Sequence, residues 1–227
     1  LRQQLIRDNH FDAARITSVP TGIDLARYTP RDRAEARRRL GLDLQRKYLG
    51  IVATLRNLKG HTYLLEAFAQ LATTQPDWDL VLVGDGPQRH NIEKHVGILN
   101  LEGRVRLGGN RDDVERWLDA FDVFVLPSYG EEGVSQSVMQ AMATGLPVVA
   151  TTVGAMAEAV KHEHTGLLVP PRNTEALYDA LACLMHDDAL RHHFGAAGLD
   201  YARRHFGIEP MLTRMEAVFR KVHGEKS

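Results

Sequence analysis

The sequence predicts an α/β fold: a Rossmann-like, doubly wound parallel sheet that carries extra helices at its carboxyl-terminal end. Short apolar runs alternate with longer segments in which apolar residues recur at helical spacing. Strands that are apolar throughout are typical of a parallel sheet covered by helices on both faces. Because 227 residues can bury one sizeable core, we expect residues 1–227 to form a single domain.

The strand and helix signals alternate along most of the chain. Apolar runs predict strands at residues 15–19, 48–55, 79–84, 104–109, 122–128, 147–152 and 165–171. Amphipathic periodicity predicts helices near residues 61–73, 87–97, 111–120, 135–144 and 155–161. Beyond these the strand signal ends, and further helices are expected at residues 174–187, 188–206 and 208–223. We expect these last helices to pack on the edge of the sheet or to extend beyond it.

The composition excludes several classes of partner. Lys and Arg total 28 and Asp and Glu total 29, so the balanced charge creates no global field for nucleic acid, and no nucleic-acid partner is expected. No apolar run approaches the roughly 18 residues that a membrane-spanning helix needs. The only cysteine, Cys183, falls at apolar helical spacing, which predicts a reduced core thiol and fits a cytoplasmic protein.

Two further patterns admit a functional and a structural interpretation. The basic run Arg31–Asp43 could form a phosphate patch, but its alternation with Glu, Asp and Leu is more typical of a solvated helix face. His162 and His164 flank a charged loop, and His192 and His193 are adjacent on a predicted helix and point in different directions. Neither histidine pair supplies a ligand cage, so no metal is expected.

The first residue is Leu1 rather than Met, and residues 1–11 read as the interior of a helix. We therefore expect the chain to be a fragment of a longer protein.

Polar residues and glycines follow the predicted strands, where open parallel sheets bind their ligands. Arg56 and Lys59 follow the first central strand and place two cations within one turn, and Gly60 leaves the backbone there uncrowded. Together they predict a phosphorylated ligand, although each cation alone could be an ordinary surface charge.

A second predicted anion site lies at the start of the helix over residues 135–144. Gly133 is expected to let the chain turn tightly into this helix. The first free N–H groups of this helix, from about Val134 through Ser135 to Gln136, would face a bound anion. The helix dipole would add to the attraction.

Two motifs invite other functions. Gly84-Asp85-Gly86 supplies two glycines of a dinucleotide fingerprint, but His90 stands near the place of the third, so an NAD site is not expected. The acidic pair in Asp77-Trp78-Asp79 resembles a metal-binding pair of some sugar transferases. It opens a strand at the opposite end from the cleft, so we interpret it as structural.

Together, these motifs resemble the carboxyl-terminal half of the retaining glycosyltransferases of family 4, which have the GT-B fold. The similarity runs from "SVPTGIDLARYTP" through "TLRNLKGHTYLLEAFAQL", "LVLVGDGP" and "EGVSQSVMQAMATGLPVVAT" to "HTGLLVPP". Single pieces are weakly specific, whereas their order and spacing are strongly specific. The resemblance implies a nucleotide-sugar-binding domain whose amino-terminal acceptor domain is absent from this chain.

The family's donor site is marked by a glutamate, seven residues and a second glutamate. Glu132 matches the first, and Gln140 stands in place of the second. The resemblance implies that Glu132 is the catalytic carboxylate that touches the donor sugar, while residue 140 holds the ribose hydroxyls. Glu131 is expected to face solvent.

The same resemblance assigns the remaining donor contacts. Arg56 and Lys59 would grip the diphosphate, and backbone around Gly109, Asn110 and Arg111 would meet the nucleotide base. Breaking a sugar–diphosphate bond leaves positive character on the sugar and negative charge on the leaving group. A carboxylate beside the sugar and cations beside the phosphates therefore both stabilise the transition state.

The resemblance implies a bacterial hexosyltransferase that acts in lipopolysaccharide or polysaccharide assembly, on a polysaccharide or glycolipid acceptor. No cofactor or metal is implied, only a nucleotide diphosphate sugar. The protein would be cytoplasmic, with any contact to the inner face of the membrane made through the absent domain. This chain alone is expected to fold and bind the donor weakly without transferring sugar. A sugar-nucleotide epimerase and a non-catalytic nucleotide-binding module are the alternatives.

Overall fold

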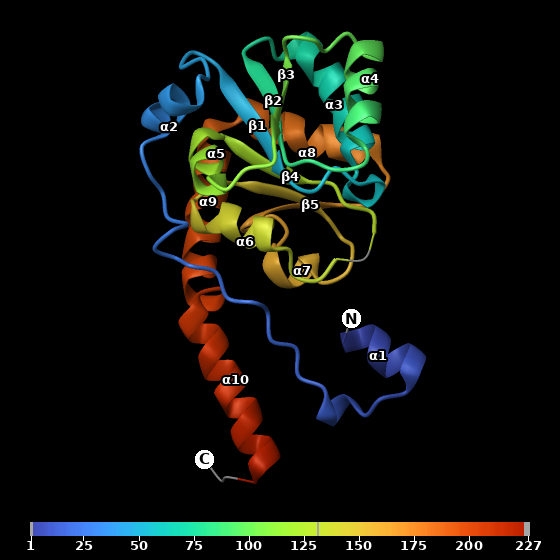
Figure 1. The fold of residues 1–227 in the computed structure, drawn as a ribbon, viewed down its shortest axis with the longest axis vertical. Helices are drawn as coiled ribbons and strands as arrows, with labels where there is room; N and C mark the ends of the chain where they lie inside the picture. Colours follow the sequence, from blue (N-terminus) through green and yellow to red (C-terminus); the bar gives the residue numbers. More distant parts are fainter. Residues whose placement is uncertain (1, 131, 225–227) are drawn as a thin grey trace.

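The computed structural model describes residues 2–130 and 132–224, whose arrangement is shown in Figure 1. Glu131, predicted to face solvent, lies outside the described residues.

The described residues form one sheet of six strands, with the order β3-β2-β1-β4-β5-β6. Every adjacent pair is parallel. The order reverses between β1 and β4, which creates a topological switch point beyond the carboxyl ends of these two strands. The predicted Rossmann-like fold is confirmed. The strands are β1 (Lys47–Val52), β2 (Trp78–Val83), β3 (Val105–Gly109), β4 (Val123–Leu126), β5 (Val148–Thr151) and β6 (Gly166–Val169).

The strand predicted at residues 15–19 does not form. Ala13–Arg15 instead makes a short 3-10 helix, η1, which the Asp12 carboxylate caps by accepting from the Ala14 N–H at 2.9 Å. Pro20 follows the predicted strand and has no N–H to donate to a ladder. The backbone of the next segment pairs with the carboxyl-terminal part of the chain at Ile23, which forms an isolated bridge with Gly207.

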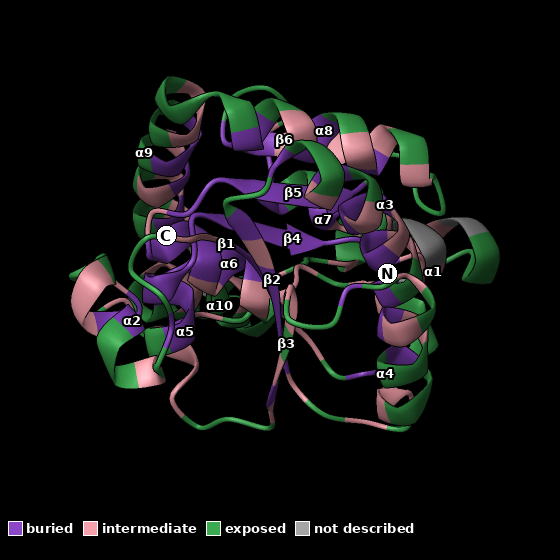
Figure 2. Cartoon of the chain, turned by 90° about the horizontal axis from the view of Figure 1, so that it is seen from above, coloured by how far each residue is buried: buried purple, intermediate pink, exposed green. Residues whose placement is uncertain are grey.

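Helices cover both faces of the sheet, and the helices predicted between and after the central strands are confirmed. On one face, α3 (His61–Thr74) packs against both α4 (Arg89–Ile98) and α8 (Thr174–His186). On the other face, α5 (Val114–Ala120) packs against α2 (Arg33–Leu40) and α6 (Gln136–Ala143), and α6 packs against α9 (Asp188–His205). Figure 2 shows the central strands β1, β4 and β5, coloured largely as buried, between these two groups of helices.

The remaining helices lie outside these layers. The short helix α7 (Met156–Ala159) follows β5. In Figure 1, α10 (Ile208–His223) extends away from the sheet, and α1 (Arg2–Asn9) also lies apart from it. The apolar side chains of Leu212, Met215 and Phe219 are exposed along α10. No helix in the described part of the chain is long and apolar enough to cross a membrane.

Cys183 is exposed and free, so the prediction of a core thiol is wrong. The buried face of α8 is formed by Leu177, Leu181 and Leu184, which recur at helical spacing. Cys183 lies two residues beyond Leu181, and positions two apart do not share a face of a helix.

The basic run Arg31–Asp43 is only partly the solvated face that its composition predicts. Arg38 and Arg39 are exposed and pair with Glu35 along α2. Arg37, in contrast, is only 7% exposed. Its guanidinium contacts Asp122 at 2.5 Å and donates to the Ala120 carbonyl at 3.0 Å. One arginine of the run therefore anchors α2 to the sheet.

The acidic pair at the start of β2 is structural, as predicted. Trp78, which stands between the two aspartates in the sequence, is completely buried. Asp79 accepts hydrogen bonds from Arg46 at 2.6 Å and from Arg104 at 3.0 Å. These pairs tie the loop before β1 and the residue before β3 to the amino end of β2.

The ion pair between Arg37 and Asp122 should contribute strongly to stability. Asp122→Ala leaves the buried Arg37 guanidinium without its carboxylate, so we expect a loss of about 3–5 kcal/mol in the free energy of unfolding. The matched control is Glu35→Ala, whose pairs with Arg38 and Arg39 are exposed to solvent and should contribute little to stability. Urea unfolding of the three proteins measures the difference. Equal losses in both variants would show that Arg37 does not depend on Asp122.

Candidate functional site

The loops that follow β1, β4 and β5 meet at the carboxyl edge of the sheet. The loop after β1 contains a 3-10 turn, η2 (Asn57–Lys59). The Tyr129 N–H, in the loop after β4, donates to the Leu58 carbonyl at 2.9 Å. Gly60 makes this approach possible, because its φ of 75° is left-handed and a side chain there would overlap the Pro127 carbonyl. The backbone thus fixes the two loops against each other.

Lys59 and Glu132 are in direct contact across these loops. The Lys59 ammonium donates a hydrogen bond to Oε1 of Glu132. The same oxygen accepts from the Ser128 hydroxyl at 2.8 Å. The two ionised side chains are 24% and 15% exposed, so they are partly shielded yet reachable from solvent. A cation and a carboxylate predicted to serve the same ligand are therefore neighbours.

The loop after β5 holds the backbone of Glu132 from the other side. The Ala155 N–H donates to the Glu132 carbonyl at 2.9 Å. Gly154 has a left-handed φ of 57°, and a side chain at this position would overlap that same carbonyl. Thr151, at the end of β5, donates its hydroxyl to the Ser128 carbonyl. The segment that carries Glu132 is therefore clamped between two neighbouring loops.

Gly133 does not have the structural role predicted for it. Its φ is not left-handed, and a side chain there would meet open space. The turn into α6 therefore does not require a glycine at this position. The close backbone approach falls at Gly154 instead, in a different loop.

The start of α6 lies directly after the clamped segment. Ser135 is the N-cap residue, but its side chain makes no capping hydrogen bond and instead lies 3.1 Å from the Ser137 hydroxyl. The first-turn N–H groups therefore receive no acceptor from the cap, and an N-terminus in this state favours an anion. Val134 is half-buried beside it. Gln140, one turn further on, is half-buried and has no side-chain hydrogen bond to the described residues.

Arg56 belongs to the same loop as Lys59 but differs from it in exposure and pairing. Its side chain is exposed, and within residues 2–130 and 132–224 it forms no ion pair. Its carbonyl accepts from the Lys59 N–H at 3.1 Å, which holds the turn. Arg56 is therefore a cation free to bind a ligand, whereas Lys59 is already paired.

The residues after β3 form a separate part of this edge. Gly109 ends the strand with a left-handed φ of 72°, and its carbonyl accepts from the Gly84 N–H at 2.8 Å. Asn110 is exposed. The Arg111 guanidinium donates to the Gly108 carbonyl at 2.8 Å and lies 5.3 Å from the centre of the Trp117 ring. No described hydrogen bond or ion pair joins this group to Lys59 or Glu132.

Tyr129 belongs to the site but was not predicted from the sequence. Its ring lies edge-on to Tyr63, with 5.8 Å between centroids, and the Arg172 guanidinium lies 4.6 Å from its centre. Arg172 comes from the loop after β6 and has a left-handed φ of 57°. The sequence offers one indication of this role, which is an aromatic residue next to the polar Ser128. The contact between Tyr129 and Arg172 is visible only in the folded structure.

His61 was also missed. It is the first residue of α3, immediately after Gly60, and it is only 3% exposed. Neither ring nitrogen has a hydrogen-bond partner among the described residues. Burial lowers the pKa of His61 to about 4; the nearby Arg56 backbone opposes this shift, and the Lys59 charge adds to it. The ring borders a cavity of about 110 Å³ that is also lined by Arg56, Thr62, Gln88, Asn91 and His95.

The described residues contain no group of three or more His, Cys, Asp or Glu side chains that could hold a metal ion. The carboxyl edge instead offers Arg56, Lys59 and the start of α6, all suited to an anion, beside the Glu132 carboxylate.

The family described as glycosyl transferases group 1 matches residues 46–187, more than half of the chain. The chain therefore belongs to the glycosyl transferases group 1 family.

Relatives of the chain are named glycosyltransferases. The lipopolysaccharide core biosynthesis mannosyltransferase LpsB of Rhizobium meliloti (strain 1021) is 33% identical over 211 residues, which cover 89% of this chain and 60% of the relative. The D-inositol 3-phosphate glycosyltransferase of Corynebacterium efficiens is 34% identical over 224 residues, which cover 93% of this chain and 52% of the relative. The chain thus spans about half the length of the curated relatives it matches.

Among solved structures, Anabaena HepE in complex with UDP and glucose has a TM-score of 0.88 at 23% identity. The match covers 96% of this chain and 60% of HepE, and at this identity it shows the fold alone.

Alanine substitutions at the two glycines of the site should have different effects on stability. Gly154→Ala should reduce the free energy of unfolding by at least about 1 kcal/mol, because its left-handed backbone and the Glu132 carbonyl leave no room for a side chain. Gly133→Ala should stay within about 0.5 kcal/mol of the parent, because the new methyl group meets open space. Urea unfolding tests both. A larger loss for Gly133→Ala than for Gly154→Ala would contradict the described clamp.

Protonation of His61 should destabilise the fold in acid. Its pKa of about 4 in the folded chain lies below the usual value near 6.5, so the unfolded chain binds the extra proton first. The neutral ring's contribution is complete above about pH 6.5 and is lost as the pH falls towards 4, by about 3 kcal/mol in total. His61→Leu should remove this part of the pH dependence in unfolding measurements from pH 7 to 4. An unchanged difference between pH 7 and pH 4 in His61→Leu would refute the assignment.

Proposed function

We propose that the chain is the donor-binding domain of a retaining, metal-independent glycosyltransferase of family 4, and that it binds a nucleotide diphosphate sugar. The observation that carries this proposal is the contact between Lys59 and Glu132 at the switch point of the sheet, beside the start of α6. A nucleotide diphosphate sugar needs cations that bind its phosphates. It also needs a carboxylate that stabilises the positive character left on the sugar when the diphosphate departs. Both kinds of group are neighbours here, and membership of the glycosyl transferases group 1 family supports the assignment.

Without a donor, Lys59 and Glu132 neutralise each other. A diphosphate would offer Lys59 a stronger, doubly charged partner, with Arg56 as the second cation and the α6 N–H groups as further donors. Glu132 would then retain the Ser128 hydroxyl and face the sugar. As the bond to the leaving diphosphate breaks, Glu132 would stabilise positive character on the sugar while Arg56 and Lys59 stabilise the departing charge.

The nucleoside contacts follow from the neighbouring positions. Gln140 would hydrogen-bond the ribose hydroxyls, because an amide can both donate and accept. Backbone around Gly109, Asn110 and Arg111 would meet the base. HepE was solved with UDP and with glucose, and this supports a uridine nucleotide as the first donor to try.

The acceptor would bind to a second, amino-terminal domain of the whole protein, since these residues span about half the length of the curated relatives. The exposed apolar side chains of Leu212, Met215 and Phe219 on α10 suit contact with that domain. The named role of LpsB in lipopolysaccharide core synthesis supports a bacterial polysaccharide or glycolipid acceptor, reached at the cytoplasmic face of the membrane. The 227 residues alone would then bind donor without transferring sugar, because the acceptor has no surface that holds it at attack distance.

The phosphate assignment is tested by calorimetry with UDP on this chain. Arg56→Ala and Lys59→Ala should each weaken binding by about 1.5–3 kcal/mol, the contribution of charge-assisted hydrogen bonds. Arg38→Ala serves as the control, because Arg38 is exposed on α2 and pairs only with Glu35. Unchanged UDP affinity in both Arg56→Ala and Lys59→Ala would sink the assignment.

The role of Glu132 is tested in the enzyme that also carries the acceptor domain. Glu132→Gln should sharply reduce sugar transfer without weakening UDP binding, because the carboxylate acts mainly as charge develops on the sugar. Product analysis by mass spectrometry measures transfer and would also reveal an epimerised free nucleotide sugar. Transfer by Glu132→Gln at the parent rate would exclude the proposed role.

A further inference from the structure

A second hollow lies at the opposite edge of the sheet, where the strands begin. It has a volume of about 570 Å³ and is bordered by the segment before α2, by α5, by the turn before β5 and by α9. Small-molecule sites in proteins commonly have volumes of this order. None of the predicted donor-site residues lines it. The hollow is therefore separate from the carboxyl edge.

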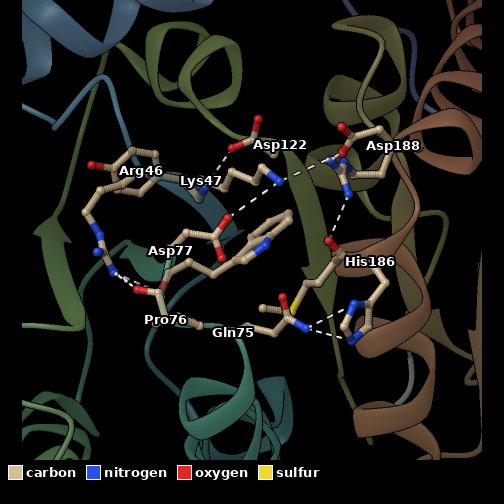
Figure 3. Close-up of polar contacts among 12 residues, drawn as sticks. Arg46, Lys47, Gln75, Pro76, Asp77, Asp122, His186 and Asp188 are labelled. Carbon is tan, nitrogen blue, oxygen red and sulfur yellow. Dashed lines mark hydrogen bonds and ion pairs between the residues drawn. The ribbon is translucent and has the colours of Figure 1, made fainter.

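Four cations border this hollow, of which Arg191 is the most buried at 11% exposed and is paired with Asp188. The side chains of Arg31, Arg33 and Lys47 are 41%, 47% and 37% exposed. Figure 3 shows the Lys47 side chain extending between Asp77 and Asp188. Its ammonium lies 3.5 Å and 3.9 Å from these carboxylates, beyond the length of an ordinary hydrogen bond. The N–H groups of Lys47 are therefore available to another acceptor.

Arg33 and Arg31 can also engage a ligand. Arg33 pairs with Asp122 at 2.9 Å, but Asp122 is already held by Arg37 and by the Tyr48 N–H. Arg31 donates from Nη2 to the Arg27 carbonyl at 2.7 Å, but its Nη1 reaches a carboxylate oxygen of Asp119 only at 3.3 Å and can turn to a ligand. A bound anion could take one or more donors from each of these arginines without leaving Asp122 unpartnered.

Asp119 provides an independent sign of a missing partner. Its side chain is 2% exposed, and Oδ1 has no hydrogen-bond partner among the described residues. Burial raises the pKa of this carboxyl, although Arg31 opposes the shift. A buried oxygen without a donor is costly, and a ligand hydroxyl or a water in the hollow would supply one.

The walls of the hollow are fixed by backbone contacts. Gly145 has a left-handed φ of 77° in the turn before β5. Helix α9 approaches this turn at Gly195, where a side chain would overlap the Gly145 carbonyl. The shape of the hollow is thus set by the fold.

We propose that this hollow is a binding site for a small phosphate monoester that carries hydroxyl groups, such as a sugar phosphate. Lys47, Arg31 and Arg33 bind the phosphate at the mouth, and Oδ1 of Asp119 accepts a hydrogen bond from a hydroxyl group. Asp119 also repels a bare anion, so the site selects a phosphate that is attached to a polyol. The proposal does not depend on donor binding at the carboxyl edge, and either can fail without the other.

The test is calorimetry on this chain, with glucose 6-phosphate, inorganic phosphate and glucose as probes. We expect saturable binding of glucose 6-phosphate, weaker binding of inorganic phosphate and no binding of glucose. Excess UDP should not displace glucose 6-phosphate, because the two edges of the sheet are separate. No saturable binding of glucose 6-phosphate, or its displacement by UDP, would overturn the proposal.

Variants then test each contact. Lys47→Met removes the ammonium, which lies 5.7 Å from the centre of the Trp78 ring, and should weaken glucose 6-phosphate binding at least tenfold, as should Arg33→Gln. Arg38→Gln is the control on the same helix as Arg33 and should leave binding unchanged. Asp119→Ala should reduce the preference for glucose 6-phosphate over inorganic phosphate at least fivefold. Circular dichroism checks that each variant is folded, and unchanged binding in folded Lys47→Met and Arg33→Gln would contradict the site.

Discussion

The site depends on one constraint, which is that the backbone after β4 is held between the loops that follow β1 and β5. On one side, Gly60 allows the first loop to press against the Pro127 carbonyl. On the other side, Gly154 allows the third loop to press against the Glu132 carbonyl, which also accepts from the Ala155 N–H. Both contacts need a residue without a side chain in a left-handed conformation. These two contacts fix the backbone that carries Glu132, and Lys59 and Ser128 then hold its side chain.

This clamp explains why a lysine and a glutamate from loops far apart in sequence form a pair. Lys59 and Glu132 are brought together because β1 and β4 are neighbours at the switch point. A partly exposed ion pair contributes little to stability. The fold would therefore be about as stable with a neutral pair at these two positions. A charged pair that a ligand can separate is instead suited to binding, since each member is already in position for a different part of the ligand.

The sequence predicts the sheet, most of its helices and the edge at which ligands bind, because apolar periodicity and strand order are local signals. It fails where tertiary contacts decide. Gly133 looks essential in the sequence because it precedes a helix, whereas Gly154 carries the close approach, which only the packing of two loops reveals. Likewise Arg37 reads as a solvated charge until Asp122, from before β4, is placed beside it. His61 offers no signal beyond its place after Gly60, since its lack of partners is a property of the folded core.

A double-mutant cycle on Lys59 and Glu132 in UDP binding tests the central claim most directly. If the carboxylate competes with a diphosphate for the lysine, Glu132→Gln should strengthen UDP binding when Lys59 is present. It should have no such effect in the Lys59→Met background. The expected coupling between the two changes is about 1–3 kcal/mol, within the range for residues in direct contact. If Glu132→Gln changes UDP affinity equally in both backgrounds, the pair is not coupled to the donor and the account of this site is wrong.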